Sequence, residues 1–312
     1  MPAFAQTLYI CRQWESKIIS YCAAKKIFRQ QSARGESRAF RKIEKSKGRI
    51  SAHYKFINFN RDRISVSFSM AEKQYRRYVS GYGYKDSEIE TLRQERKRTR
   101  RQVWKAAYDI GGKSAAQRAL KLADAEFNRN LKEFLESRGF KLLPGNKVEA
   151  DIPSIAKRNK RIMNLLARTF QKISRQRAYD SYDTIGAVVS MVQTALLYKV
   201  PPLVENGKHT GGVLPPARAM LSGWGDCDTK SALAMAVLSN WSGVHLVGVA
   251  VPHHYLFAIK RVPGKRDLFV RYNGAEYVLI EAAGPAWLEP GRVGDNTMAL
   301  IDRRSSFKIE PI

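Results

Sequence analysis

The segment from Pro201 to Ala282 constrains the fold more than any other part of the chain. A Gly/Pro-rich connection leads to the run 223–227, Gly-Trp-Gly-Asp-Cys, and apolar residues at helical spacing follow it. Four strand-like runs come next, at residues 244–251, 255–260, 268–272 and 277–282. A helix followed by consecutive strands is typical of an α+β core with an antiparallel sheet.

The preceding residues are predicted to be mainly helical. Helices are expected from Asp86 or Ser87 to about residue 108, from residue 114 to a glycine cap at residue 139, and from Asp151 and Asp183 onward. Alternating residues at 64–70 predict one strand, whereas the basic stretch 34–49 predicts a mobile or weakly helical arm. We therefore expect a basic arm at 1–60, a mainly helical basic region at 61–180 and an α+β domain at 181–312.

The positive charge is unevenly distributed. The chain has 55 Lys+Arg against 28 Asp+Glu, a net charge of +27, but residues 181–312 hold only 13 basic and 11 acidic residues. Nearly all the excess therefore belongs to residues 1–180. This asymmetry favours a polyanionic partner, such as nucleic acid, an anionic membrane surface or an acidic protein. A solvated helical surface rich in Lys and Arg is the alternative interpretation.

Two basic patterns resemble anion-binding motifs only superficially. The run 111–114, Gly-Gly-Lys-Ser, lacks the earlier glycine of a phosphate-binding loop, since Ala107 stands there, and no strand is predicted before it. We interpret it as a helix stop followed by a cap. The basic run Arg93–Arg101 spreads around most of a helix, so a solvated face is at least as consistent as a nucleic-acid surface.

Cysteine content and hydropathy exclude several classes of protein. Cys11, Cys22 and Cys227 are odd in number and form no CxxC motif, which argues against a disulfide framework or a zinc site. Cys11 and Cys22 are most simply helix-packing residues. No run of about 18 apolar residues predicts a transmembrane helix. The brief apolar start at 1–10 lacks a basic region and a cleavage pattern, so we expect a cytoplasmic protein.

Cys227 has the setting of a reactive thiol. It lies in the first turn of the predicted helix, where unpaired backbone N–H groups and the helix dipole favour a thiolate. Gly223 and Gly225 would let a substrate backbone approach closely. The negative charges of Asp226 and Asp228 disfavour formation of the thiolate, so the positive charge of a nearby imidazolium would have to outweigh them. A small buried core cysteine is the alternative interpretation.

A base and an orienting acid follow at suitable places. His253 and His254 precede a strand, and strand alternation lets only one of them face the cysteine. Glu281 ends a later apolar strand, where a carboxylate needs a partner such as an imidazole N–H on the neighbouring strand. Each residue alone has a structural explanation, but together they form a nucleophile, a base and an orienting group.

With these motifs the chain resembles the transglutaminase-like cysteine hydrolase superfamily, in particular its bacterial branch of cysteine proteases. The likeness rests on Gly225–Leu233, on His254 directly before the apolar run 255–259, and on Tyr277–Glu281 with Trp287 after it. Weaker likeness extends upstream, and the whole covers about residues 60–290. Its weaker parts are Val189–Gln193 with Tyr198, Pro216–Leu221, and Ser137–Phe140 with Asp151–Pro153.

The resemblance implies a papain-like, transglutaminase-like core at 181–312 that performs acyl transfer through a cysteine thioester. It makes Cys227 the nucleophile, His254 the general base and acid, and Glu281 the orienting group. His254 is preferred to His253 because the family's histidine directly precedes the strand. The side chain of Gln193 would donate to the oxyanion with the Cys227 backbone N–H. Glu281 departs from the aspartate that is common in the family.

The expected function is therefore that of a cysteine peptidase, amidase or transglutaminase acting on a protein or peptide. No cofactor is expected. Some relatives bind calcium near the cysteine, but Asp226 and Asp228 are too few carboxylates to assign such a site. One alternative is a non-catalytic protein that keeps the fold and binds nucleic acid or another polyanion through residues 1–180. Another is a hydrolase that this basic region holds on a polyanionic surface.

Overall fold

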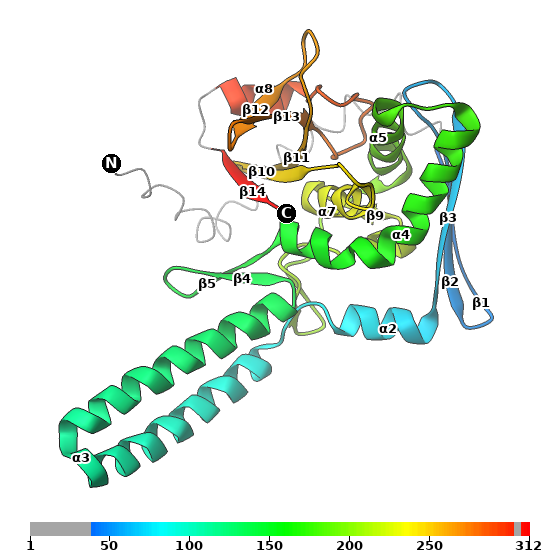
Figure 1. Cartoon of the computed structure of the whole chain (residues 1–312). Helices are drawn as coiled ribbons and strands as arrows, with labels where there is room; N and C mark the ends of the chain where they lie inside the picture. The colour runs from blue at the N-terminus through cyan, green and yellow to red at the C-terminus, as the bar shows by residue number, and fades with distance from the viewer. Residues whose placement is uncertain (1–38, 303–306) are drawn as a thin grey trace. The chain divides into compact units, whose positions relative to one another are not determined.

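The computed structural model describes residues 39–302 and 307–312 (Figure 1). The chain divides into two compact units. The first contains the described residues up to Val79 together with Ile152–Pro201 and Val213–Ile312, and the second contains Ser80–Asp151 and Pro202–Gly212. The first unit thus draws residues from all three predicted regions. Cys11 and Cys22 lie outside the described residues.

A five-stranded sheet forms one layer of the first unit. It has the order β12-β13-β11-β10-β14, and each neighbouring pair is antiparallel. The predicted α+β class with an antiparallel sheet is confirmed, as are its four strands. A fifth strand, which lies near the C-terminus of the chain and forms one edge of the sheet, was not predicted. The strands are β10 (Leu246–Val251), β11 (His254–Lys260), β12 (Phe269–Tyr272), β13 (Ala275–Ile280) and β14 (Lys308–Pro311).

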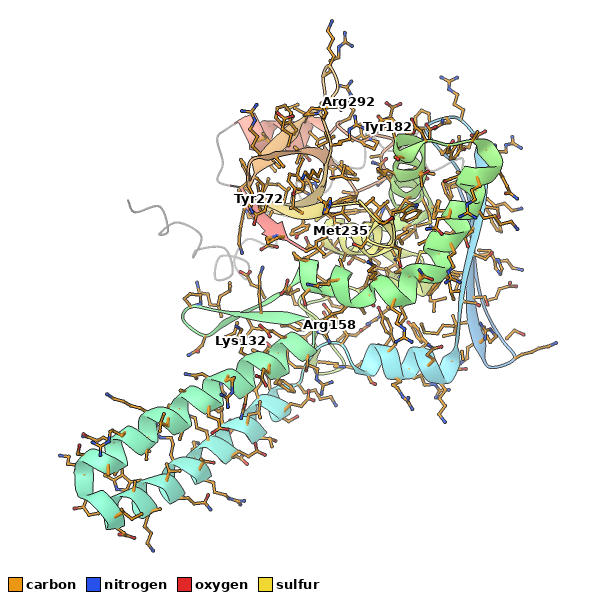
Figure 2. The ribbon with its side chains drawn as sticks, in the orientation of Figure 1. Lys132, Arg158, Tyr182, Met235, Tyr272 and Arg292 are labelled. Carbon is orange, nitrogen blue, oxygen red and sulfur yellow. The ribbon has the colours of Figure 1, made fainter. Side chains whose placement is uncertain are left out.

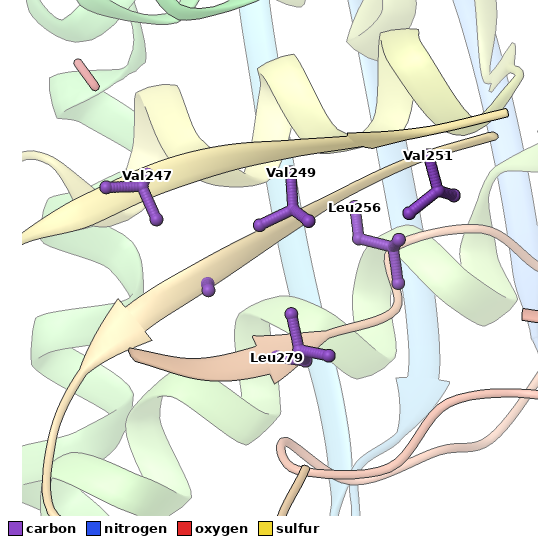
Figure 3. Close-up of a cluster of buried hydrophobic side chains, with 6 residues drawn as sticks. Val247, Val249, Val251, Leu256 and Leu279 are labelled. Carbon is purple, nitrogen blue, oxygen red and sulfur yellow. The ribbon is translucent and has the colours of Figure 1, made fainter. Parts of the chain in front are cut away.

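One face of this sheet buries a cluster of aliphatic side chains. Val247, Val249 and Val251 alternate along β10, and Leu256 and Leu279 join them from the next two strands (Figure 3). Side chains that alternate along a strand share one face, so pairing in register brings these residues together. The helix α8 (Asp295–Asp302) adds partly buried residues to the cluster.

Buried helices complete the first unit. In α7 (Cys227–Leu238), Asp228 is the only residue that is not buried, as expected for a helix that packs on all sides. One face of α4 (Ile152–Arg177) also joins the core. The helix predicted at Asp183 begins earlier, because Asp180 is its N-cap and accepts from the Asp183 N–H at 2.8 Å. The remaining helical segments are α5 (Ser181–Ser190), the π-helical turn η2 (Met191–Ala195) and α6 (Pro216–Ser222).

A three-stranded antiparallel sheet, β1-β2-β3, also belongs to this unit. The strand predicted at 64–70 is confirmed as β3 (Arg63–Ala71), but the weakly structured arm predicted at 34–49 is wrong from residue 40 onward. There the chain forms β1 (Phe40–Ser46), which turns back into β2 (Arg49–Ile57). Because β1 is exposed at nearly every residue, it lacks apolar alternation, and only its pairing with β2 defines it.

The second unit contains a helical hairpin. Its helix α3 (Asp86–Ser137) is interrupted at Gly111 and Gly112, and Gly112 has a φ of 65°. Figure 1 shows the two legs lying side by side. Arg96 and Arg100 on the first leg pair with Asp124 on the second. The predicted helix stop is therefore confirmed, and Gly111 and Gly112 form the turn of the hairpin.

Short elements complete the two units. In the second unit, β4 (Phe140–Leu143) pairs with β5 (Lys147–Ala150), and β7 (Val204–Glu205) pairs with β8 (Lys208–His209). The first unit adds α2 (Glu72–Ser80, whose last residue lies in the second unit) and a parallel pair, β6 (Leu197–Tyr198) with β9 (Trp224–Gly225). Among the described residues, every helix is too short or too polar to span a bilayer.

Candidate active site

Cys227 is the first residue of α7. The N-cap Asp226 accepts a hydrogen bond from the Thr229 N–H at 3.1 Å, which fixes the start of the helix. Gly225 permits this geometry, since a Cβ there would lie 2.3 Å from the Thr229 side chain. Cys227 itself is only 3% exposed. The predicted helix start is confirmed, and the thiol lies beneath the surface.

The first turn of α7 contacts the start of β11 through the backbone of Tyr255. The Tyr255 N–H donates to the sulfur of Cys227, and the Ser231 hydroxyl donates to the Tyr255 carbonyl at 3.4 Å. Cys227 and Ser231 are one turn apart on the same side of the helix. Both contacts fall on the residue that directly follows His254, so the helix start lies beside this histidine.

His254 and Glu281 form a buried pair. Nε2 of His254 lies 2.8 Å from Oε1 of Glu281, and the two side chains are 8% and 2% exposed. Strand register explains their meeting. Phe257 pairs with Ile280, so extending the register by one residue sets Glu281 opposite Leu256, diagonal to His254 on the same face. The structure thus brings this predicted base and this predicted acid together.

Two further donors satisfy the Glu281 carboxylate. The Thr297 hydroxyl donates to Oε2 at 2.8 Å, and the Ala283 N–H donates to Oε1 at 3.3 Å. A buried carboxylate needs several hydrogen bonds to offset its desolvation. Thr297, on α8, was not predicted as part of this site, and no sequence motif links it to Glu281.

His253 occupies a different position. It lies in the turn between β10 and β11 with a φ of 63°, and its side chain is exposed. The structure therefore pairs His254, and not His253, with the acid.

The environment favours a protonated His254. Burial alone would lower the pKa of this imidazole, but the Glu281 carboxylate outweighs burial, with help from Asp228 and Asp226, and raises the pKa above its ordinary value. Glu281 therefore stabilises the imidazolium form.

The environment of Cys227 acts in the opposite direction from the expected helix-dipole effect. Burial, and then the charges of Asp228 and Asp226, raise the pKa of the thiol well above its ordinary value. The thiol donates to Oδ1 of Asp228 at 3.8 Å. The opposing aspartates noted in the sequence therefore dominate, and the resting sulfur is a neutral thiol.

Gln193 lies in the π-helical turn and is fully buried. Its Nε2 donates to the carbonyls of Glu281 and Leu288 at 2.6 and 2.9 Å, and its Oε1 accepts from the Leu288 N–H at 2.9 Å. Gly284 permits this approach, since a Cβ there would lie 2.0 Å from the Gln193 carbonyl oxygen. In this arrangement the amide fastens the segment that follows the acid, and its oxyanion role stays a prediction.

A buried lysine was also missed by the sequence analysis. Lys230 lies one turn after Cys227, is fully buried, and donates from Nζ to the Leu196 carbonyl at 2.8 Å. It ties α7 to the end of the π-helical turn. A lysine just before the largely apolar run 232–238 was the available signal.

The described residues do not provide a good calcium site. Asp226, Cys227 and Asp228 have ligand atoms within 4.8 Å of one another. Calcium prefers six to eight oxygen ligands, whereas this group offers two carboxylates and a sulfur, and Asp226 already accepts the Thr229 N–H.

Comparison of the chain with protein-family models, curated proteins and solved structures finds no match. The class defined by the fold is a mixed α+β protein with an antiparallel sheet.

Proposed function

We propose that this protein is a cysteine hydrolase with a transglutaminase-like, papain-like core, acting by acyl transfer through a thioester of Cys227. The observation that carries the proposal is the buried His254–Glu281 pair, beside the helix start that bears the thiol. A nucleophile, a base and a group that orients the base form the minimum apparatus for this chemistry.

The first step makes the nucleophile. Because the resting thiol is neutral, the neutral form of His254, which is populated above its raised pKa, removes the thiol proton as the substrate carbonyl is attacked. Nε2 faces Glu281, so Nδ1 is the ring nitrogen that accepts this proton. Glu281 then stabilises the imidazolium. The sulfur bonds to the carbonyl carbon, and the carbonyl oxygen takes the negative charge.

The second step divides the intermediate. His254 returns its proton to the leaving amine as the carbon–nitrogen bond breaks, which leaves an acyl thioester on Cys227. Water, or a second amine, then loses a proton to His254 and attacks the thioester. The acyl group leaves as an acid or a new amide, and the sulfur recovers its proton. The Cys227 backbone N–H and a further donor would bind the oxyanion.

The test uses a small acyl donor, because Cys227 is buried and only 3% of its surface is exposed. The full chain is incubated with p-nitrophenyl acetate, and the acylated residue is found by mass spectrometry. We expect the acyl group on Cys227 and its loss in Cys227→Ala. His254→Ala should slow acylation by about 10²-fold or more.

The neighbouring histidine is the matched control. His253 is exposed in a turn, so His253→Ala should acylate at the wild-type rate. Acylation of Cys11 or Cys22 in place of Cys227, or equal rates in both histidine variants, would remove the proposal. A non-catalytic polyanion-binding protein stays the alternative prediction, and it requires binding that is indifferent to Cys227→Ala.

A further inference from the structure

We propose that the outward face of α4 binds the phosphate backbone of a nucleic-acid duplex. This inference is independent of the proposed hydrolase. Helix α4 contains eight basic residues and no acidic residue. Arg158 marks the helix in Figure 2.

Six of these basic residues form a single ridge. With about 100° per residue, their positions fall within an arc of about 120° on the helix. All six are exposed. The ridge runs for about 27 Å along the axis at about 1.5 Å per residue. We call this set the α4 ridge, and it comprises Lys157, Lys160, Arg161, Arg168, Lys172 and Arg175.

The charges of the ridge are not neutralised within the protein. In the part of the chain that the structure describes, no member of the ridge forms an ion pair with an acidic side chain. The first leg of the α3 hairpin differs, because Arg96 and Arg100 share Asp124 there. Cations that stay unpaired can release counterions from a phosphate backbone.

The ridge is rigid because the opposite face of α4 belongs to the core. Ile155, Met163, Leu166 and Phe170 on that face are at most 2% exposed. The helix is also fastened near its middle, where Asn164 donates to Asn240 at 3.0 Å. Ordering the ridge on a ligand therefore costs little backbone entropy.

The same arrangement argues for a duplex and against a membrane. A helix that lies in a bilayer surface inserts its apolar face among the lipids, whereas the apolar face of α4 is already buried in the protein. Leu165 is its only large apolar side chain that is well exposed. A basic helix fits a groove about 12 Å wide and contacts the phosphates beside it. Phosphate contacts give affinity without sequence preference.

The experiment compares two triple variants of the full chain in binding to a short DNA duplex. Arg161→Gln, Arg168→Gln and Lys172→Gln remove three charges from the ridge. The control variant, Lys97→Gln, Arg98→Gln and Arg101→Gln, removes an equal number of charges from exposed positions of α3. Binding is measured between about 50 and 200 mM salt. Circular dichroism and alkylation of Cys227 should match the wild type in both variants.

We expect the ridge variant alone to lose affinity. Its Kd should rise about tenfold or more at about 0.1 M salt, and the slope of log affinity against log salt should fall by about 0.9 for each phosphate that the variant no longer neutralises. Equal losses in both variants would overturn the proposal by showing diffuse attraction. It would also fail if wild-type binding to duplex were absent while vesicles containing phosphatidylserine retained the protein through the ridge.

Discussion

At the scale of single residues, the site separates two titratable groups by their surroundings. His254 and Cys227 are both buried, yet the carboxylate beside the imidazole favours its charged form, whereas the aspartates beside the sulfur disfavour the thiolate. Such a site begins its reaction as a neutral thiol and transfers the proton during attack. Opposed environments of this kind are common where acid–base chemistry occurs.

Glu281→Gln tests the histidine pair through its pH dependence. The folded pKa of His254 lies above its unfolded value of about 6.5. The stability from the pair is therefore fully present below about pH 6.5 and is lost as pH rises through the folded pKa. The variant should lose about 1–3 kcal/mol of unfolding free energy below that pH, and less at high pH. Denaturant titrations across pH measure the difference.

The control for this variant is Glu276→Gln. Glu276 pairs with the exposed Arg271 at 3.2 Å, so its loss should cost at most about 1 kcal/mol. A difference between wild type and Glu281→Gln that grows with rising pH would contradict the assigned pair.

Asp228→Asn tests the environment of the thiol. The Asp228 carboxylate raises the pKa of Cys227 and accepts a hydrogen bond from its thiol, so removing the charge should lower that pKa. The rate of Cys227 alkylation by iodoacetamide should increase at neutral pH, and its pH profile should move to lower pH. Glu133→Gln on α3 is an exposed control that should leave the profile unchanged. A profile that moves to higher pH would show that Asp228 does not act on the sulfur electrostatically.

At the scale of elements, the site depends on where helices and strands meet. Tyr255 joins α7 to β11, and its hydroxyl also donates to Glu310 on β14 at 3.1 Å. Gly248 permits this crossing of β10, since a Cβ there would lie 1.9 Å from the Tyr255 hydroxyl oxygen. The histidine strand is therefore held both by α7 and by the edge strand β14 of its own sheet.

Gln193→Leu tests how the π-helical turn holds the segment after the acid. The substitution leaves the carbonyls of Glu281 and Leu288 and one N–H without their amide partner. Each buried unsatisfied group costs about 1–3 kcal/mol, so the variant should lose at least about 2 kcal/mol of unfolding free energy. Hydrogen exchange should show faster exchange at the Leu288 amide. The exposed substitution Gln176→Leu should change neither quantity, and unchanged exchange in Gln193→Leu would contradict the fastening role.

At the scale of the whole molecule, the net charge divides into paired and unpaired parts. Part of the +27 charge lies on the α3 hairpin, where acidic residues on the same helix offset it. The α4 ridge has no such compensation, although α4 belongs to the unit that contains Cys227. The total charge therefore says less about partners than the position of each cation does.

The sequence alone determined the elements with strong local signals. The four strands, the helix that begins at Cys227 and the break at Gly111–Gly112 follow from apolar period, capping residues and glycine, which act over a few residues. The pairing of β1 with β2 and the pairing of β14 with β10 could not be predicted, because exposed strands are defined by their partners. Only the tertiary structure decided between His253 and His254, added Thr297 to Glu281, and directed the Gln193 amide to two carbonyls. These outcomes depend on strand register and burial, which join residues far apart in the chain.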